Sequence, residues 1–217
     1  MKQILNTRLQ SLLTEVRACQ ICSSSIPSPN PVLRASTSSS VLVISQAPGT
    51  KVHASGVPWD DASGRRLRQW MGISDAEFYD DSLVAIVPMG FCYPGKGKSG
   101  DLPPRPECAP QWHSAILDQL PNIRCTLLIG LYSQNYYAPA RLSGPVGANT
   151  EHAKAKPYKN LTERVRDWKR FVPSHYVLPH PSPRNQMWLR RNPWFELHAV
   201  PHLQQTMRSI LPRPGEI

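Results

Sequence analysis

No apolar stretch of the 217-residue sequence approaches the length of a membrane-spanning helix, and no segment is repeated along the chain. Residues 1–13 mix polar and apolar side chains and contain no continuous hydrophobic segment of the kind that secretory signals carry. The sequence therefore predicts a cytoplasmic protein without membrane association and without a repeat architecture.

Acidic residues are also scarce. The chain has 15 Asp and Glu residues against 25 Lys and Arg residues, which gives a formal net charge of +10 and an isoelectric point near 9.7. This excess favours a polyanionic partner, and nucleic acid before a membrane surface. The five cysteines, in a chain without a secretory signal, are predicted to be metal ligands or buried thiols rather than disulfides.

Short apolar runs alternate with segments of helical periodicity. Strands are predicted over residues 41–44, 84–87, 125–130 and 176–178, and helices over residues 3–18, 63–72, 109–120, 161–171 and 194–210, with a further helix after residue 130. Strands that alternate with helices indicate a parallel sheet. We predict one α/β domain over residues 1–217, with a helix and a C-x-x-C arm in residues 1–40 and the core in residues 41–210.

Two predicted strands end in residues suited to chemistry. Trp59, Asp60 and Asp61 follow the first strand, and His180 lies between two prolines after the fourth. In open α/β sheets ligands bind outside the carboxyl ends of the strands, so adjacent strands would bring these residues to a common edge. A carboxylate and a histidine there can activate water and stabilise developing charge. The simpler alternatives are a turn-rich surface loop and a histidine held by backbone groups.

The residues around these positions resemble the uracil-DNA glycosylase superfamily. Gln46-Ala47-Pro48-Gly49 is similar to the G-E-x-P-G motif of the iron–sulfur-containing family 4, and the spacing through Trp59 to Gly64 is similar to that family's G-x-P-F-V-G-x-x-G segment. His180-Pro181-Ser182-Pro183 resembles the H-P-S-P motif of several branches. The resemblance covers residues 15–200 and implies a three-layer α/β/α fold with a central four-stranded parallel sheet.

The cysteines resemble the same family. Cys19 and Cys22 form a C-x-x-C pair, and Cys92 and Cys108 bound a long Gly-, Pro- and Lys-rich segment that predicts neither helix nor sheet. The resemblance implies that these four thiolates hold a structural [4Fe–4S] cluster. A Cys₄ zinc site uses the same ligands and is the alternative. Cys125 begins an apolar strand and is predicted to be a buried core thiol.

The implied reaction is hydrolysis of the N-glycosidic bond of a flipped nucleotide in DNA, as in base-excision repair. Trp59 would stack on the base, and residues 46–49 would line the pocket. His180 would donate a hydrogen bond to the base oxygen on which charge develops. Asp61 resembles the aspartate of the family 5 segment F-T-G-D-x-S-G with one residue of slippage, and Asp60 is the competing assignment for the carboxylate that stabilises the sugar.

Two departures from family 4 leave the substrate open. Pro88 stands where that family has an asparagine that reads the pyrimidine edge, and proline has neither a side-chain donor nor an N–H group. Gln46 replaces the glutamate of the first motif. The alternatives are a glycosylase with broad specificity for deaminated bases, reading of uracil through backbone groups, and a catalytically silent nucleic-acid-binding member of the same fold.

Basic and apolar residues near the predicted site suit a DNA surface. Phosphate contacts position a duplex, and an apolar side chain can fill the vacated stack. The candidates are Lys96, Lys98, Arg184, Arg190 and Arg191 for the backbone, and Met187, Trp188 and Leu189 for the stack. Lys51 is the only lysine in the predicted pocket loop, and we expect no lyase activity. We expect a monomer, located on the bacterial nucleoid when it is bound to DNA.

Overall fold

The computed structural model describes residues 2–26, 28–98, 100–138 and 158–212. Its centre is a parallel sheet with the strand order β2 (Val84–Ile86), β1 (Val41–Ile44), β5 (Cys125–Ile129) and β6 (His175–Leu178). Every residue of these strands is buried. A parallel sheet that is covered on both faces favours largely apolar strands over alternating ones, which is why the short apolar runs marked the strands. The predicted four-stranded parallel sheet is confirmed.

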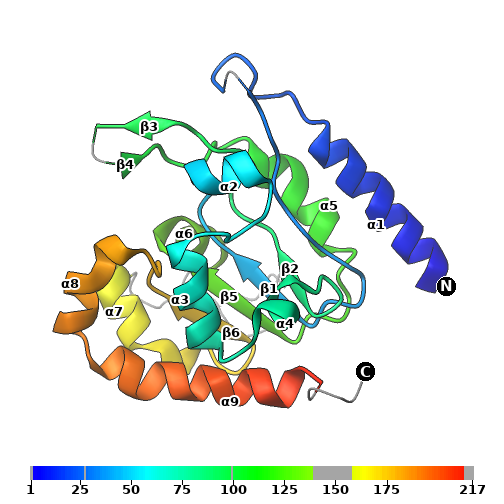
Figure 1. Cartoon of the computed structure of the whole chain (residues 1–217). Coiled ribbons are helices and arrows are strands. Elements are labelled where there is room, and N and C mark those ends of the chain that lie inside the picture. The colour runs from blue at the N-terminus through cyan, green and yellow to red at the C-terminus, as the bar shows by residue number, and fades with distance from the viewer. Residues whose placement is uncertain (1, 27, 99, 139–157, 213–217) are drawn as a thin grey trace.

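Helices flank this sheet (Figure 1). The α-helices are α1 (Lys2–Arg17), α2 (Thr50–Ser55), α3 (Ala62–Met71), α4 (Asp75–Tyr79), α5 (Ser114–Leu117), α6 (Leu131–Tyr137), α7 (Leu161–Arg166), α8 (Gln186–Arg191) and α9 (Val200–Ile210). The π-helical turns η1 (Ala109–His113) and η4 (Phe195–Ala199) lead into α5 and α9, and η2 (Trp168–Arg170) and η3 (Pro183–Asn185) are 3₁₀ turns. Helix α1 packs against α5, and α3 packs against α9.

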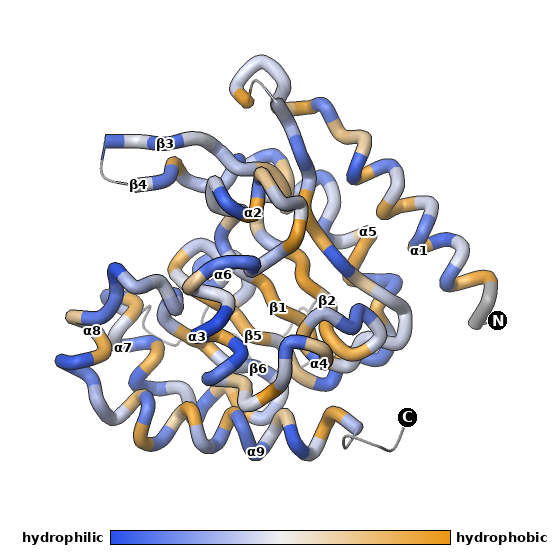
Figure 2. The backbone as a smooth tube through the Cα atoms, in the orientation of Figure 1, coloured by the Kyte–Doolittle hydropathy of each residue, from blue (hydrophilic) through white to orange (hydrophobic). Residues whose placement is uncertain are grey.

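The hydrophobic core joins the sheet to both groups of helices. Leu9 and Leu13 of α1, Leu67 of α3 and Leu203 of α9 are all buried in the same cluster as the strands. Hydrophobic residues run along the central strands, whereas α1 and α9 alternate between hydrophobic and hydrophilic residues (Figure 2). This alternation is expected of helices with one face on a core and one in water. None of the helices within the described ranges is both long and apolar enough to cross a bilayer.

Helix α3 begins and ends at defined caps. The Asp61 side chain accepts a hydrogen bond from the Gly64 N–H at the N-terminus, and Gly72 takes a left-handed conformation (φ 68°) at the C-terminus. Leu67, Trp70 and Met71 are buried as the helical pattern predicted. Arg68 is buried as well.

The buried Arg68 side chain links α3 to α4. Its guanidinium pairs with Asp75 and lies over the rings of Phe78 and Tyr79, each 5.3 Å from the ring centroid. Its Nη1 donates to the Trp59 carbonyl at 3.4 Å. Burial of an arginine is tolerable because the charge is paired and stacked. The helical pattern could not reveal this, since the partners come from outside α3.

Three predictions about the chain differ from the structure. The first and fourth strands are not adjacent, because β5 lies between β1 and β6. The segment after β2 contains a small antiparallel hairpin of β3 (Lys96–Gly97) and β4 (Gly100–Asp101), where neither helix nor sheet was predicted. The loop after β1 contains the short helix α2. The polar loop predicted at 141–160 lies almost wholly outside the described residues.

Candidate active site

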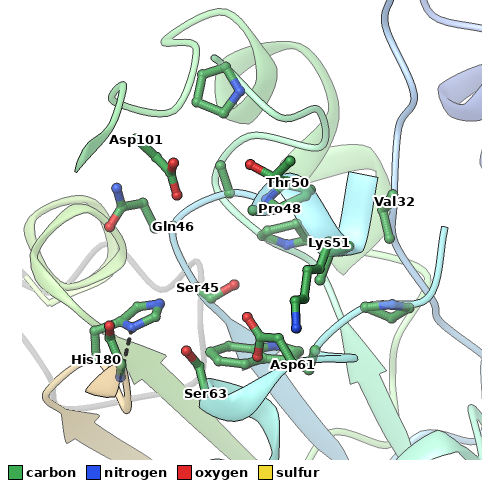
Figure 3. Close-up of a pocket in the computed structure, with 18 of the residues that line it drawn as sticks. Val32, Ser45, Gln46, Pro48, Thr50, Lys51, Asp61, Ser63, Asp101 and His180 are labelled. Atoms are coloured by element: carbon green, nitrogen blue, oxygen red, sulfur yellow. Dashed lines mark hydrogen bonds between the residues drawn. The ribbon is translucent and has the colours of Figure 1, made fainter. Parts of the chain in front are cut away.

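A cavity of about 500 Å³ opens at the carboxyl edge of the sheet, a size typical of pockets for small organic groups. Most of its lining comes from the loop after β1 with the start of α2, the turn that leads into α3, the end of β4 with Leu102, and the residues that follow β6. The other lining residues are Val32, Ile86, Pro88 and Pro94. Figure 3 shows their side chains converging on one space. Although β1 and β6 are separated by β5, their loops meet here, so the common edge inferred for Trp59, Asp61 and His180 exists.

Trp59 lies in a strained turn beneath the cavity. Its φ of 60° is rare for a bulky side chain, and its exposed fraction is 8%. The indole and the His180 imidazole are roughly parallel, with centroids 5.6 Å apart and an interplanar angle of 27°. The Trp59 carbonyl accepts from Arg68 and approaches Gly64 so closely that a Cβ atom on Gly64 would lie 1.7 Å from the oxygen. Gly64 and Arg68 therefore hold the turn that presents Trp59.

The two adjacent aspartates have different surroundings. Asp61 lines the cavity and is half-buried, and its Oδ1 accepts from the Gly64 N–H at 2.8 Å. Asp60 is exposed and is not among the residues that line the cavity. A carboxylate that acts on a bound sugar must face the site. The geometry therefore favours Asp61 over Asp60.

His180 is held in one orientation by the turn that follows β6. Its Nδ1 accepts from the Ser182 backbone N–H at 3.2 Å, which places the proton of a neutral ring on Nε2 (Figure 3). Asn185 Nδ2 donates to the His180 carbonyl at 2.7 Å, and Arg66 of α3 donates to the Ser182 carbonyl. The free ring nitrogen is thus a donor, as stabilisation of a developing oxyanion requires.

The electrostatic setting of His180 combines burial with acidic neighbours. Burial lowers the pKa of the imidazole, and the carboxylates of Asp61 and Asp101 oppose that shift in part. The net direction is downward from the usual value, so the neutral donor form is favoured at neutral pH. A neutral imidazole that donates from Nε2 can accept growing negative charge on a ligand without first losing a proton.

The residues predicted to bind the base lie along one wall. Gln46, Ala47, Pro48 and Gly49 line the cavity after β1, and Pro88 lines it after β2. Backbone hydrogen bonds between the two chain segments continue past the ends of β1 and β2. The Met89 and Gly90 N–H groups donate to the Ser45 and Gln46 carbonyls, each at 3.0 Å. The wall after β2 therefore offers neither a polar side chain nor a free N–H group at residues 88–90.

A buried histidine supports this wall from behind. His113 Nε2 lies 3.0 Å from the Pro88 carbonyl, and its Nδ1 accepts from the Tyr137 hydroxyl. The imidazole also stacks on Phe91, with centroids 5.5 Å apart. Burial lowers the pKa of His113 to about 4, and burial likewise lowers the pKa of His175 in β6 to about 4. Both rings are therefore neutral in the folded protein over the physiological range.

The fold is expected to lose stability as the pH falls from about 6.5 to about 4. In this window the unfolded chain binds protons at His113 and His175 that the folded chain does not, so each ring contributes stability that is present above pH 6.5 and lost through pH 4. The loss is on the order of 3 kcal/mol per ring. Urea unfolding at pH 7 and 4.5 measures it. The variant His113→Gln should show a smaller pH slope and exposed His198→Gln an unchanged one; identical slopes in all three proteins would contradict the assignment.

The residues predicted to contact DNA fall into two groups. Arg184 lines the cavity, whereas Lys96 and Lys98 of the hairpin and Arg190 and Arg191 of α8 are exposed and lie outside its lining. The hairpin and α8 are both at the left of Figure 1. The hairpin reaches the cavity through β4, and α8 reaches it through the residues after His180, because both of these segments line the cavity. Basic side chains thus lie on two elements that continue from the cavity wall.

Among the three apolar candidates for the vacated stack, only Met187 is available. Its exposed fraction is 55%. Leu189 is buried in the core, and Trp188 packs edge-on against Trp194 and Phe195 while its Nε1 donates to the Thr162 hydroxyl at 2.8 Å. Trp188 and Leu189 therefore serve the packing of α8 against the last helices.

The four cysteines predicted as ligands lie near one another. Cys22, Ile26 and Cys92 form a small hydrophobic cluster of their own. Burial raises the pKa of Cys92 to about 11 and that of Cys108 in the same direction, and in both cases the charges of the other thiols add to the rise. No group of three His, Cys, Asp or Glu side chains in the described segments is spaced to hold a single metal ion. Cys125 lies in β5 and is buried in the core, as expected.

Among the cavity residues that were not predicted to bind a ligand, two are charged. Asp101 comes from β4 and lies near the Gln46 side chain, and Lys51 of α2 points toward Asp61 (Figure 3). No periodicity in the sequence places either one, because α2 and the hairpin are too short to show a pattern. An acid within a Gly-, Pro- and Lys-rich segment was the one available signal for Asp101.

Comparison with protein families agrees with this geometry. The model of the Uracil DNA glycosylase superfamily matches residues 34–204. The matched region begins before β1, extends into α9, and includes the loop after β1, the turn before α3, the hairpin and the His180 turn. It also includes Cys92 and Cys108 but not Cys19 and Cys22. With more than three quarters of its sequence matched, the chain belongs to the uracil DNA glycosylase superfamily.

Proposed function

We propose that this protein is a DNA glycosylase that hydrolyses the N-glycosidic bond of uracil or another deaminated base, as the first step of base-excision repair. The observation that carries the proposal is one cavity with Asp61 and His180 at its wall and the Trp59 ring against His180. An extruded nucleotide places its base and its sugar in such a pocket together. Superfamily membership supports the reaction class.

The cavity divides the chemistry between two sides. His180, with its proton on Nε2, donates to a carbonyl oxygen of the base as the bond breaks and negative charge moves onto the ring. Asp61, on the other side in Figure 3, stabilises the oxocarbenium-like sugar and orients the attacking water. Trp59 provides an aromatic face for the base. Water takes the place of the base at C1′, and the released base takes up a proton.

We further propose that the enzyme acts by hydrolysis alone and leaves the DNA strand intact. Among the described residues, Lys51 is the lysine that lines the cavity. A lyase reaction would have to use its amine, so the proposal is tested at this residue. Strand cleavage without alkali, or a covalent adduct on Lys51 trapped by borohydride, would contradict this assignment. Alkali-dependent cleavage that Lys51→Ala leaves in place would support it.

The experiment that tests the function is a panel of end-labelled oligonucleotides that carry uracil, hypoxanthine or xanthine, single-stranded or opposite each normal base. Each is incubated with protein and then treated with alkali. Cleavage at a lesion identifies the substrate, and a related strand without the lesion is the control. Binding throughout the panel without abasic product would favour the alternative, a silent nucleic-acid-binding member of the fold.

Met187 is proposed to fill the space that the flipped base vacates, because it is the exposed apolar side chain at the start of α8. We expect Met187→Ala to slow excision from duplex DNA by about tenfold, since most of the apolar contact is lost. Excision from single strands, which have no stack to fill, should change little. Ile4→Ala, which removes an exposed apolar side chain from α1, is the control. Equal losses on both substrates would contradict the role.

We also propose that the protein carries a [4Fe–4S] cluster and is closest to family 4 within the superfamily. The support is the donor set: four cysteines whose charges influence one another, held by the N-terminal arm and the long segment after β2. The contribution of the cluster would be to pin these two segments together.

Metal content tests the cluster independently of activity. A brown protein with broad visible absorbance that is lost in Cys92→Ser and kept in Cys125→Ser is the expected result. A colourless protein from anaerobic preparation that contains zinc would favour the alternative ion.

A further inference from the structure

The wall after β2 cannot identify a base by polar contacts at residues 88–90. Pro88 has no polar side chain and no N–H group, and its carbonyl is already paired with His113. The Met89 and Gly90 N–H groups are taken by the carbonyls of Ser45 and Gln46. The backbone N–H donors at this wall are therefore taken. A polar side chain that reads the base edge must come from another part of the cavity.

The hairpin supplies a candidate on the neighbouring side. Asp101, at the end of β4, lines the cavity and lies close enough to His180 for its charge to act on the imidazole. A Cβ atom on Gly49 would be 3.9 Å from the Asp101 Oδ2 atom, so the carboxylate reaches the loop after β1. Figure 3 shows Asp101 and Gln46 near each other, above His180, with Lys51 and Asp61 across the cavity.

The Asp101 carboxylate is without a cationic partner among the described residues. Its Oδ1 accepts from the Tyr93 hydroxyl at 3.3 Å, and it forms no ion pair with a described residue, although Lys96 is directly opposite it on β3. In a chain with a net charge of +10, an unpaired acid in a cavity leaves acceptor positions for a ligand. An ionised carboxylate accepts hydrogen bonds and donates none.

The hairpin and the turn after His180 are neighbours at the cavity. Gly100 has a φ of 146°, and a Cβ atom there would be 2.7 Å from Nη1 of Arg184. Arg184 itself lines the cavity from the turn after His180. The guanidinium therefore lies beside β4, the strand that carries Asp101.

Deamination changes the base edge in the way that an acceptor-only group detects. Cytosine N3 and adenine N1 are bare acceptors, whereas uracil N3 and hypoxanthine N1 carry a hydrogen atom beside a carbonyl. A carboxylate attracts that N–H group and repels the lone pair of cytosine or adenine. An asparagine amide, by contrast, has both a donor and an acceptor.

We propose that Asp101 is a specificity-determining residue that accepts the ring N–H group next to the carbonyl of a deaminated base. This inference rests on the proposed function, since it names the edge that the same cavity reads: an unsubstituted ring N–H beside a C=O, which separates uracil from cytosine and hypoxanthine from adenine. Thymine and guanine carry the same N–H group, so their exclusion needs other contacts. His180 contacts the oxygen and Asp101 the adjacent nitrogen. Pro88 then has no reading role, and the pocket accepts more than one such base.

The test compares DNA with uracil and DNA with N3-methyluracil, in which a methyl group replaces the hydrogen atom. Excision is measured under single-turnover conditions, and binding is measured on duplexes with the corresponding 2′-fluoroarabino nucleotides, which resist hydrolysis. The parent should prefer uracil by about 10- to 100-fold, as expected for a hydrogen bond to a charged group. Asp101→Ala should lose most of this preference in both measurements, while Asp118→Asn, which removes an exposed acid just after α5, should keep it.

The outcomes separate the inference from the proposed function. A parent that prefers uracil in binding but releases no base would overturn the glycosylase and support Asp101 as the reader. A parent that releases uracil and retains its full preference in Asp101→Ala would overturn the role of Asp101 alone. Equal treatment of uracil and N3-methyluracil by the parent would overturn it as well. Thermal unfolding of Asp101→Ala shows whether the variant is folded, and Asp101→Asn, which keeps the shape, should weaken discrimination against cytosine in binding.

Discussion

Replacing Asp61 with asparagine is expected to slow base excision by about 10²- to 10³-fold without unfolding the protein. The carboxylate faces the cavity across from His180, where positive charge develops on the sugar as the base leaves. Asparagine is as good an N-cap as aspartate, so its side-chain oxygen can still accept from the Gly64 N–H group. The substitution therefore removes the charge and keeps the start of α3.

Asp60→Asn is the matched control for this prediction. It removes the same charge one residue earlier, from an exposed side chain outside the cavity lining. Single-turnover excision should remain within about twofold of the parent, as is usual for a surface position. A loss in Asp60→Asn with an unaffected Asp61→Asn would reverse the assignment. Asp61→Ala should show the same catalytic loss with a further destabilisation of about 1 kcal/mol from the missing cap.

Gly64→Ala is expected to lower the free energy of unfolding by about 3 kcal/mol and to abolish excision. Alanine in a helix is normally favoured over glycine by up to about 1 kcal/mol. The substitution therefore destabilises the protein only if the contact made by the new Cβ atom costs more than this. Here the new Cβ atom would lie 1.7 Å from the Trp59 carbonyl oxygen, a backbone atom that cannot rotate away. The turn at Trp59 must move, and with it the indole and the Asp61 cap.

Chemical denaturation measures this effect, and Gly49→Ala serves as the control. Gly49 has a φ of −89°, and a Cβ atom there would meet nothing closer than 3.9 Å, so its stability should change by less than about 1 kcal/mol. Equal stability of Gly64→Ala and the parent would show that the turn relaxes freely. In that event, the strained conformation of Trp59 would not depend on Gly64.

The sheet, and the place of Asp61 and His180 at the cavity, could be predicted because local chemistry dominates there. Val41–Ile44 and Cys125–Ile129 are apolar runs too short for helices, and such runs are typical of a buried parallel sheet. Asp61 precedes a helical pattern as an N-cap would. His180 follows β6 directly, at the edge where parallel strands present ligands.

The rest depends on contacts between distant residues. The order of the strands is set by packing across the whole sheet, so the separation of β1 and β6 by β5 left no local pattern. The hairpin that carries Asp101 lies beside Arg184, some eighty residues further along the chain. Arg68 is buried because Asp75, Phe78 and Tyr79 surround it. Periodicity within one segment carries no information about such partners.

The most direct measurement is mass-spectrometric detection of the free base released from uracil-, hypoxanthine- and xanthine-containing duplexes, with the parent protein and Asp61→Asn compared under single-turnover conditions. We predict that the parent releases at least one of these bases, with an equal amount of abasic strand, and that Asp61→Asn releases it at least about a hundredfold more slowly. Tight binding of all three duplexes by the folded parent without any free base would contradict the assignment of this cavity as a glycosylase active site.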